Sequence, residues 1–221
     1  MSDPALKTAL FEQLARVGKA LGSGKRLELL DLLAQAERTV EALAAASGLN
    51  LTTASAHLQT LKQAGLVSTR RDGTRIFYRL SGPDVADLFV RARQVAAARL
   101  PDVQAARDAY LGDGHHITSL DSVELARRMA AGDLTLLDVR PEPEYAAGHL
   151  PGAINIPVEQ IEERLNEVPF DREVVAYCRG PYCVFAHEAV KVLQAHGRRV
   201  ARLTDGVTEW RLAGLPVSTK V

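Results

Sequence analysis

The chain of 221 residues lacks the features that mark several classes of protein. Its two cysteines are too few for a disulfide framework, so we expect a reducing, cytoplasmic environment. No apolar run is long enough to span a membrane, and the first residues, MSDPALKTALFEQ, lack the basic and then apolar order of a secretory signal. The formal net charge is zero, which excludes nucleic-acid binding over the whole surface unless the charge is segregated.

The charge is in fact divided unevenly along the chain. Residues 1–112 carry 15 Lys and Arg against 11 Asp and Glu, whereas residues 113–221 carry 12 against 16. The basic excess lies between Lys62 and Arg79, where five basic residues accompany a single acid, Asp72. This asymmetry predicts a nucleic-acid-binding face on the first half alone.

A short polar segment rich in glycine, residues 111–116, separates two regions with different patterns of apolar residues. Before it, the apolar pattern is mainly helical, with one strand pair. After it, short β runs alternate with amphipathic stretches, which is typical of a parallel α/β sheet. We therefore expect two domains, residues 1–110 and 117–221, joined by a linker at 111–116.

The sequence of the first half predicts a helix-turn-helix followed by a β-hairpin. A short helix is expected at Val40–Ala46, and Asn50 is a suitable N-cap for a second helix at Leu51–Ala64. Two strands around an Asp-Gly turn are expected within Leu66–Leu80. From Pro83 to about Tyr110 the pattern predicts one long helix.

The run VEALAAASGLNLTTASAHLQTLKQAGLV, residues 40–67, with the basic hairpin after it, resembles the ArsR family of winged-helix repressors over residues 6 to about 100. We expect the second helix to bury Ala54, Leu58 and Leu61 and to meet base edges with its other face. The family often has Arg where this chain has Ala56, so the hairpin is expected to contribute more of the DNA contact. The expected DNA-binding residues are Thr52, Thr53, Ser55, Gln59, Lys62, Arg70, Arg71 and Arg75.

Members of the family commonly sense metals through Cys or His pairs, but the equivalent positions here do not fit. The helix at Val40–Ala46 has no Cys, and Asp84–Leu100 has no His. We therefore expect no metal and no cofactor in this domain, so the signal must enter elsewhere. A homodimer is expected, mainly through the terminal helices predicted at Leu6–Leu21 and Pro83–Tyr110, because two half-sites need two winged helices. The candidate seam residues are Leu10, Leu14, Leu88 and Val95.

The second half contains several motifs in a fixed order. A buried strand ends in Asp138-Val139-Arg140, EYAAGHLPGAINIP follows at 144–157, and a second strand, Val174–Tyr177, runs directly into Cys178. An amphipathic helix and DGVTEW at 205–210 come last. The set resembles the rhodanese, sulfurtransferase-like family over residues 117–217. Asp205 stands where the family often has glycine. The resemblance implies a parallel sheet, with Asp138 and Arg140 as structural residues near the active loop.

Cys178 is the expected nucleophile, since it lies where a parallel strand ends and ligands bind. Loop amides and the next helix N-terminus should lower its thiol pKa, and Arg179 can steer an anionic donor. The resemblance implies that Cys178 takes up sulfane sulfur as a persulfide. Cysteine-dependent phosphatases need Arg six positions after the cysteine. This chain has Val184 at that position, which excludes phosphatase chemistry.

Cys183 stands where sulfurtransferases often have Arg, which should weaken thiosulfate binding. It is either a packing residue or a resolving thiol for Cys178. We expect a bridge through an inserted sulfur, which lengthens the reach. A direct disulfide is also conceivable, but its geometry is restrictive. A soft-metal or metalloid site of Cys178, Cys183 and His187 is a less favoured alternative.

Three functions compete. The first is a repressor that binds double-stranded operator DNA as a homodimer and senses reactive sulfur, with a persulfide, a polysulfide or thiosulfate as donor. The second is an active sulfurtransferase tethered to DNA, and the third is a regulator whose second domain only binds a partner. An intact loop around Cys178 argues against the third, and turnover separates the other two. No membrane association is expected.

Overall fold

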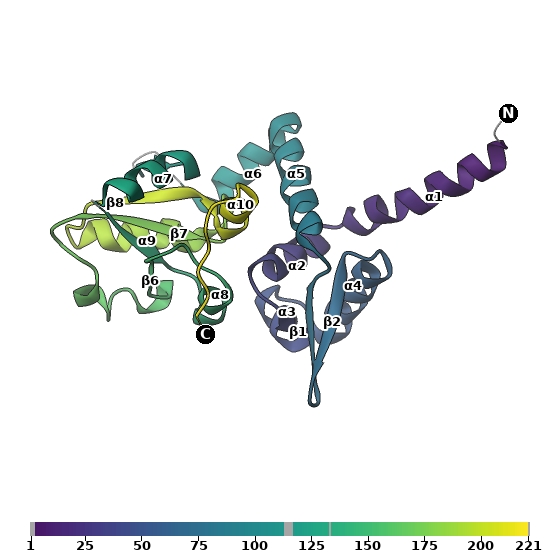
Figure 1. Cartoon of the computed structure of the whole chain (residues 1–221), viewed down its shortest axis with the longest axis horizontal. Coiled ribbons are helices and arrows are strands. Elements are labelled where there is room, and N and C mark those ends of the chain that lie inside the picture. The colour runs from purple at the N-terminus through teal and green to yellow at the C-terminus, as the bar shows by residue number, and fades with distance from the viewer. Residues whose placement is uncertain (1–2, 113–116, 133, 221) are drawn as a thin grey trace. The chain divides into compact units, whose positions relative to one another are not determined.

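The computed structural model describes residues 3–112, 117–132 and 134–220 (Figure 1). These residues form two compact units, Met1–Arg91 and Ala92–Val221. Within the described residues, no helix is both long and apolar enough to cross a membrane.

The first unit is mainly helical and carries a small antiparallel sheet of order β1-β3-β2. Its core is apolar, with Leu29, Leu58, Leu61 and Phe89 among the buried side chains. Its helices are α1 (Pro4–Leu21), α2 (Gly24–Gln35), α3 (Val40–Ala46), α4 (Leu51–Gln63) and the first part of α5 (Pro83–Arg99). Its strands are β1 (Arg38–Thr39), β2 (Val67–Asp72) and β3 (Arg75–Leu80).

Local sequence explains the helix-turn-helix and the hairpin. The Asn50 side chain accepts a hydrogen bond from the Thr53 amide at 2.8 Å, which caps α4 as predicted. Between β2 and β3, Gly73 has a φ of 57°, a conformation that favours glycine and closes the turn. The predicted burial of Ala54, Leu58 and Leu61 is confirmed, since each is 0% exposed.

The second unit is a parallel five-stranded sheet of order β4-β8-β7-β5-β6, with helices on both faces. The strands are β4 (Ser119–Leu120), β5 (Leu134–Asp138), β6 (Ile154–Asn155), β7 (Glu173–Cys178) and β8 (Val200–Gly206). The helices are α6 (Pro101–Leu111), α7 (Ser122–Ala131), α8 (Glu142–Ala147), α9 (Val184–Ala195) and α10 (Val207–Leu212), with single turns η1 (Val158–Gln160) and η2 (Leu165–Glu167).

Strand β7 shows why the sequence there is continuously apolar. Its residues alternate between two cores, so that Val174, Ala176 and Cys178 pack on the face that α9 covers. Val175 and Tyr177 pack on the other face, with α7 and α10. A central strand covered on both faces has no position for a solvated polar side chain. The expected fold class, a winged helix followed by a rhodanese-like parallel sheet, is confirmed.

The single long helix expected from Pro83 to about Tyr110 is wrong. The chain leaves the helical conformation at Leu100, with φ −110° and ψ 106°, and starts again as α6. Pro101 causes the break, because a proline disfavours the helical conformation in the residue before it. Helix α6 then packs against α9.

The two units divide inside α5, between Arg91 and Ala92, whereas the sequence places the domain boundary at residue 110. Contact between α6 and α9 accounts for the difference, because it assigns α6 to the second unit. Of the expected linker at 111–116, Leu111 and Gly112 end α6. Residues 113–116 lie outside the described residues.

Candidate functional site

Helix α4 presents a polar face away from the core of the first unit. Thr52 and Gln59 are exposed, while Thr53 and Ser55 are half-buried. The Gln59 amide nitrogen donates a hydrogen bond to the hydroxyl of Tyr78 on β3 at 3.3 Å. This contact joins the helix face to the hairpin, so both could approach one ligand together.

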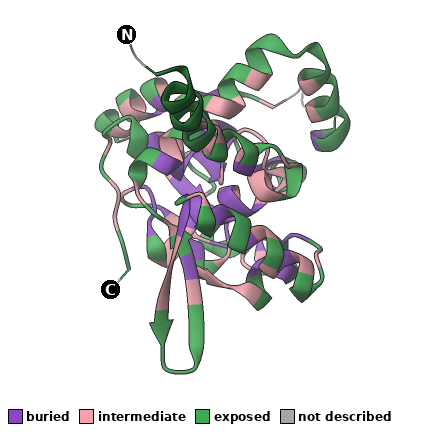
Figure 2. Cartoon of the chain, turned by 90° about the vertical axis from the view of Figure 1, so that its right-hand side faces the viewer, coloured by how far each residue is buried: buried purple, intermediate pink, exposed green. Residues whose placement is uncertain are grey.

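The far end of the hairpin is exposed over residues 71–76 (Figure 2). It carries Arg71, whose Nε donates to the Gly73 carbonyl at 3.0 Å, and Arg75. Lys62 of α4 lies beside β2, where its Nζ donates to Thr69 Oγ1 at 3.1 Å. Cations on this exposed tip suit phosphate contact or the minor groove.

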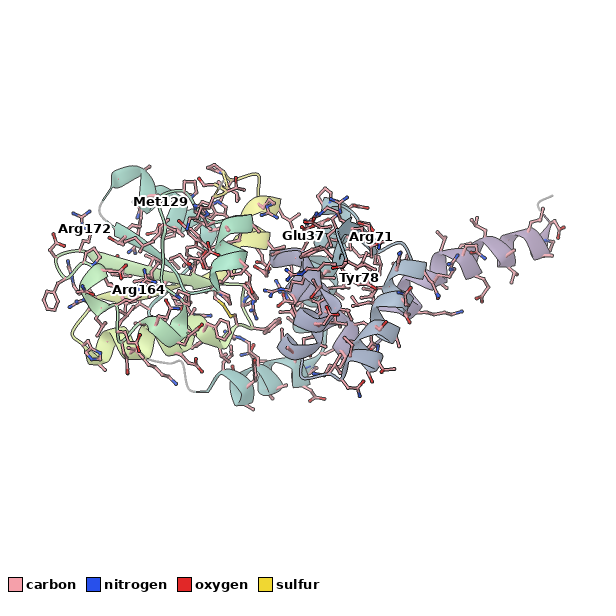
Figure 3. The ribbon with its side chains drawn as sticks, turned by 90° about the horizontal axis from the view of Figure 1, so that it is seen from below. Glu37, Arg71, Tyr78, Met129, Arg164 and Arg172 are labelled. Atoms are coloured by element: carbon pink, nitrogen blue, oxygen red, sulfur yellow. A yellow bond between two sulfur atoms is a disulfide. The ribbon has the colours of Figure 1, made fainter. Side chains whose placement is uncertain are left out.

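Arg70 of the hairpin forms ion pairs with two acidic side chains of its own unit. It forms an ion pair with Glu37, which lies beside the hairpin (Figure 3), and a second with Asp72 at 3.3 Å. The hydrogen bond from Arg70 holds the pKa of Glu37 below its ordinary value. No motif in the sequence pointed to Glu37, because it precedes the two-residue strand β1, which is recognised by its pairing with β3.

Helix α1 carries apolar side chains that nothing in its unit covers. Leu6, Leu10, Phe11 and Leu14 are all more than half exposed. Figure 1 shows the first part of α1 extending away from the helices beside its end. Large exposed apolar side chains in one segment are typical of a protein–protein contact.

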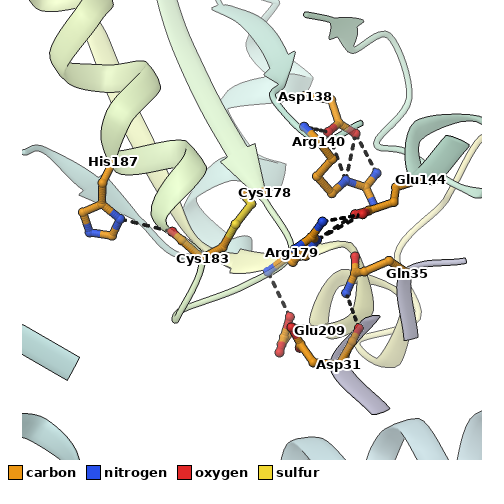
Figure 4. Close-up of a disulfide and its surroundings, with 11 residues drawn as sticks. Asp31, Gln35, Asp138, Arg140, Glu144, Cys178, Arg179, Cys183, His187 and Glu209 are labelled. Carbon is orange, nitrogen blue, oxygen red and sulfur yellow. Dashed lines mark hydrogen bonds and ion pairs between the residues drawn. A yellow bond between two sulfur atoms is a disulfide. The ribbon is translucent and has the colours of Figure 1, made fainter. Parts of the chain in front are cut away.

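In the second unit, Cys178 ends the central strand β7 and forms a disulfide with Cys183, the N-cap residue of α9 (Figure 4). The two Cα atoms are 6.3 Å apart, within the usual range of about 4.4–6.8 Å. The sulfurs of Cys178 and Cys183 can therefore bond directly, without the inserted sulfur that we expected. The structure contains the oxidised form of the loop. The expectation that loop amides lower the pKa of a free Cys178 thiol therefore stays a prediction.

The loop between the cysteines passes directly over Gly206. A Cβ at this position would lie 2.1 Å from the Arg179 carbonyl oxygen, so only glycine fits without a shift of the loop backbone. The neighbouring departure from the family pattern also has a structural role. Asp205 accepts hydrogen bonds from the amide and the hydroxyl of Ser122, at 3.1 and 2.6 Å.

Arg179 is held by a carboxylate that sequence analysis missed. Its Nη2 donates to Glu144 Oε1 at 2.6 Å, and Glu144 is 0% exposed. The guanidinium also lies over the Phe185 ring, 5.0 Å from the centroid. Glu144 belongs to the EYAAGH motif, which was the available signal. The expected role of Arg179 in steering a donor stays a prediction.

Asp138 and Arg140 form a fully buried ion pair near Glu144 (Figure 4), with 2.6 Å between Oδ2 and Nη2. Arg140 also donates to the Gly148 carbonyl at 2.7 Å. The pair therefore connects the end of β5 to the segment that follows α8. The structure places both residues where they can hold backbone in position.

Helix α5 contacts the cysteine loop through Arg93, which belongs to the second unit. Arg93 forms an ion pair with Glu209 of α10, and its guanidinium lies 5.4 Å from the Tyr182 ring centroid. Glu209 in turn accepts a hydrogen bond from the Gly206 amide at 2.9 Å. No pattern in the sequence indicated a role for Arg93, Tyr182 or Glu209.

His187 lies one turn after Cys183, but its Nδ1 is 3.3 Å from the Cys183 carbonyl oxygen. Both cysteines are bonded to each other. Among the described residues, no group of three or more Cys, His, Asp or Glu side chains could hold a metal ion.

Comparison with known proteins matches both units. The family model named bacterial regulatory protein, arsR family, matches residues 23–69. The family model for rhodanese-like domains matches residues 121–213. The HTH-type transcriptional regulator Rv0324 of Mycobacterium tuberculosis is 57% identical over 211 residues, which cover 96% of this chain and 92% of that protein.

Two further proteins each match one unit. A sulfurtransferase of Allochromatium vinosum is 36% identical over 102 residues, 46% of this chain and 94% of that protein. The homodimeric winged helix-turn-helix domain of a possible ArsR-family regulator from Mycobacterium bovis, solved by NMR, is 59% identical, covers 46% of this chain and 93% of that one, and has a TM-score of 0.43. The chain belongs to the arsR family of bacterial transcriptional regulators and carries a rhodanese-like domain after its winged helix.

Proposed function

We propose that this regulator senses reactive sulfur through Cys178 and Cys183, and that their redox state changes its affinity for operator DNA. The observation that carries the proposal is the direct bond between the two sulfurs, at the end of β7 and the start of α9. A bond at this point joins two elements that a reduced loop would leave unlinked. Closure therefore changes the backbone of residues 179–182.

The reaction proposed has two steps. The Cys178 thiolate attacks the outer sulfur of a low-molecular-weight persulfide, R–S–SH, forming Cys178–S–SH and releasing R–S⁻. The Cys183 thiolate then attacks the Cys178 sulfur, closing the disulfide and releasing HS⁻. The two cysteines lose two electrons together, and the persulfide is reduced to a thiol and hydrogen sulfide.

The proposed path from the loop to the DNA-binding unit runs through α5. Tyr182 lies in the loop that the disulfide closes, and Arg93 lies over its ring. Residues of the same helix nearer its start, Val85, Phe89 and Val90, are buried in the core of the first unit. A movement of Tyr182 would therefore act on a helix that is fixed at its other end.

For DNA binding we propose a homodimer that reads operator DNA with α4 and the hairpin. Support comes from the exposed apolar side chains of α1, including the expected seam residues Leu10 and Leu14. The expected seam residues of α5, Leu88 and Val95, are also exposed, at 37% and 61%. Light scattering at micromolar concentration should give a dimer. A monomer with full operator affinity would contradict the proposal.

The main experiment is a titration of fluorescent operator DNA with reduced and with persulfide-treated protein. We expect Kd to change at least about fivefold, and we expect the Cys178→Ser and Cys183→Ser variants to lose the response. Mass spectrometry after alkylation should show both thiols blocked and no added sulfur. Added sulfur with both blocked would indicate a polysulfide bridge instead. If Cys183 stays alkylatable while DNA binding responds, the persulfide alone is the signal.

The coupling path has its own test in the same assay. Arg93→Met should reduce the change in Kd several-fold while disulfide closure still occurs. Arg91→Met is the matched control, since Arg91 lies on the same helix, is exposed and pairs with Asp87. An unchanged response in Arg93→Met would remove this path.

The second candidate is a working sulfurtransferase, and the likeness of the second unit to a protein named a sulfurtransferase favours it. An enzyme would cycle, whereas a sensor would react once and hold the change. Sulfur transfer should therefore be followed over many equivalents of donor with a thiol acceptor present. Release of more than one equivalent of product per chain would favour the enzyme.

A further inference from the structure

Strand β8 contains a buried arginine, Arg202, which lies outside the disulfide loop. Arg202 is 4% exposed, and its register partner on β7 is Ala176. Ala201 and Leu203, on either side of it, belong to the core with α7 and α10. Because side chains alternate along a strand, Arg202 points to the opposite face, which α9 covers.

The guanidinium of Arg202 has donors without a partner among the described residues. Its Nε and Nη1 atoms are buried, and neither donates a hydrogen bond to any described group. Arg107 of α6 has the same deficit at its own buried Nε, although its Nη1 lies 3.9 Å from Asp108. Buried polar groups without partners are rare in folded proteins, because each costs the full desolvation of a donor.

Positive charges act on Arg202 and on His187. Burial and the nearby charge of Arg107 lower the pKa of Arg202. Burial, followed by the charges of Arg202, Arg107 and Lys191, lowers the pKa of His187. These residues come from three elements, α6, β8 and α9. The place between them therefore combines unsatisfied donors with a positive potential, which is the character of an anion site.

We propose that Arg202 and Arg107 bind a small inorganic oxyanion between α6, β8 and α9. A guanidinium donates to oxyanions in fixed directions, which suits a tetrahedral dianion such as sulfate, thiosulfate or phosphate. The anion would hold α6 against the helix that begins at Cys183. This site is separate from the sulfur chemistry of Cys178, and it stands or falls independently of the proposed function.

The test is thermal unfolding of the full-length Cys178→Ser variant, which cannot react with sulfur donors at that position. Sulfate is titrated at constant ionic strength against chloride. The melting temperature should rise in a saturable way, by about 5 °C or more at ~100 times Kd. Adding Arg202→Met should abolish the rise and raise the melting temperature without sulfate, because it removes an uncompensated buried charge.

Two further variants keep the result decisive. Arg107→Met should weaken the sulfate response even if Arg202→Met fails to fold. Arg127→Met is the matched control, since Arg127 is 71% exposed on α7, and it should keep the full response. A flat titration, or an equal rise in the variants without Arg202 or Arg107, overturns the proposal.

Parallel titrations identify the source of the anion. A response to thiosulfate but not phosphate would assign a sulfur oxyanion, and comparable midpoints would assign a general oxyanion site. Asp113 lies outside the described residues, so Asp113→Asn is included. If only that variant responds to sulfate, a carboxylate of the chain fills the site, and the proposal is wrong.

Discussion

The two compact units treat charged side chains in opposite ways. In the described part of the first unit the buried polar side chains are Gln35 and Ser47, and the charged side chains are exposed or half-buried. In the described part of the second unit four charged side chains are buried, namely Asp138, Arg140, Glu144 and Arg202. A surface charge is available to a large partner, whereas a buried one acts on the backbone or on a small ligand.

This difference agrees with DNA contact by the first unit and with the small reactant proposed for the second. Arg71 and Arg75 of the hairpin can meet phosphates without first leaving a partner in the core. The buried pairs Asp138–Arg140 and Glu144–Arg179 cannot do so, but they fix the segments that surround the cysteine loop. Stability and binding should therefore respond to substitution differently in the two units.

The largest expected effect comes from the buried pair. Arg140→Met leaves the Asp138 carboxylate buried without its partner, so the second unit should lose about 3–5 kcal/mol of unfolding free energy. Urea denaturation of the full chain would measure it. The double variant Asp138→Leu/Arg140→Met should recover most of the loss, and Arg127→Met should change little. A loss below about 1 kcal/mol in Arg140→Met would show that the pair is dispensable.

A smaller loss of stability is expected at the crossing of the loop over β8. Gly206→Ala places a methyl group against the Arg179 carbonyl, so the loop must shift at a cost of about 1–3 kcal/mol. The rate of disulfide closure should fall with it. Gly18→Ala is the control, because a Cβ there meets nothing within 4 Å. Equal stability of the two variants would mean that the loop accommodates the methyl group.

In the first unit, substitutions should change binding rather than folding. Arg71→Ala and Arg75→Ala should weaken binding to every DNA sequence and reduce the slope of log K against log salt by about 0.9 each. Thr53→Ala and Gln59→Ala should instead relax the preference for operator over random DNA. Titrations at several salt concentrations separate the two effects, and an unchanged slope would show that the hairpin does not touch DNA.

The smallest effect is expected at Glu37, which competes with DNA for Arg70. Glu37→Gln should release Arg70 and steepen the salt slope by at most about 0.9. It should also remove a contribution to stability that depends on pH. Because the pKa of Glu37 is lowered from 4.5 in the folded state, the Glu37–Arg70 pair stabilises the fold above that pH and less as pH falls. Acid titration of wild type and variant should therefore converge at low pH.

Sequence patterns predicted the elements whose signals are local. The cap at Asn50, the Asp-Gly turn and the apolar strand that ends at Cys178 each depend on a few adjacent residues. Strand β1 has only two residues, which is too short to show a period. The break at Leu100 was readable from Pro101, but the apolar pattern continues across it and favours one helix.

The missed partners are all distant in sequence. Glu37 and Arg70 are 33 residues apart, Glu144 and Arg179 are 35 apart, and Arg93 and Glu209 are 116 apart. Periodicity shows which side of a helix or strand is buried. It does not show which charged side chain of another element packs against that side. Such pairs become visible only when the fold brings the elements together.

The ring that the disulfide closes is very small. The bond joins residues only five positions apart, so it removes little freedom from the unfolded chain, about 2 kcal/mol against about 4.7 for a loop of 100 residues in the chain-entropy account. Making or breaking such a bond therefore changes the global stability less than closing a long loop would. In a sensor of the kind proposed, such a bond would record past exposure reversibly rather than hold the fold together.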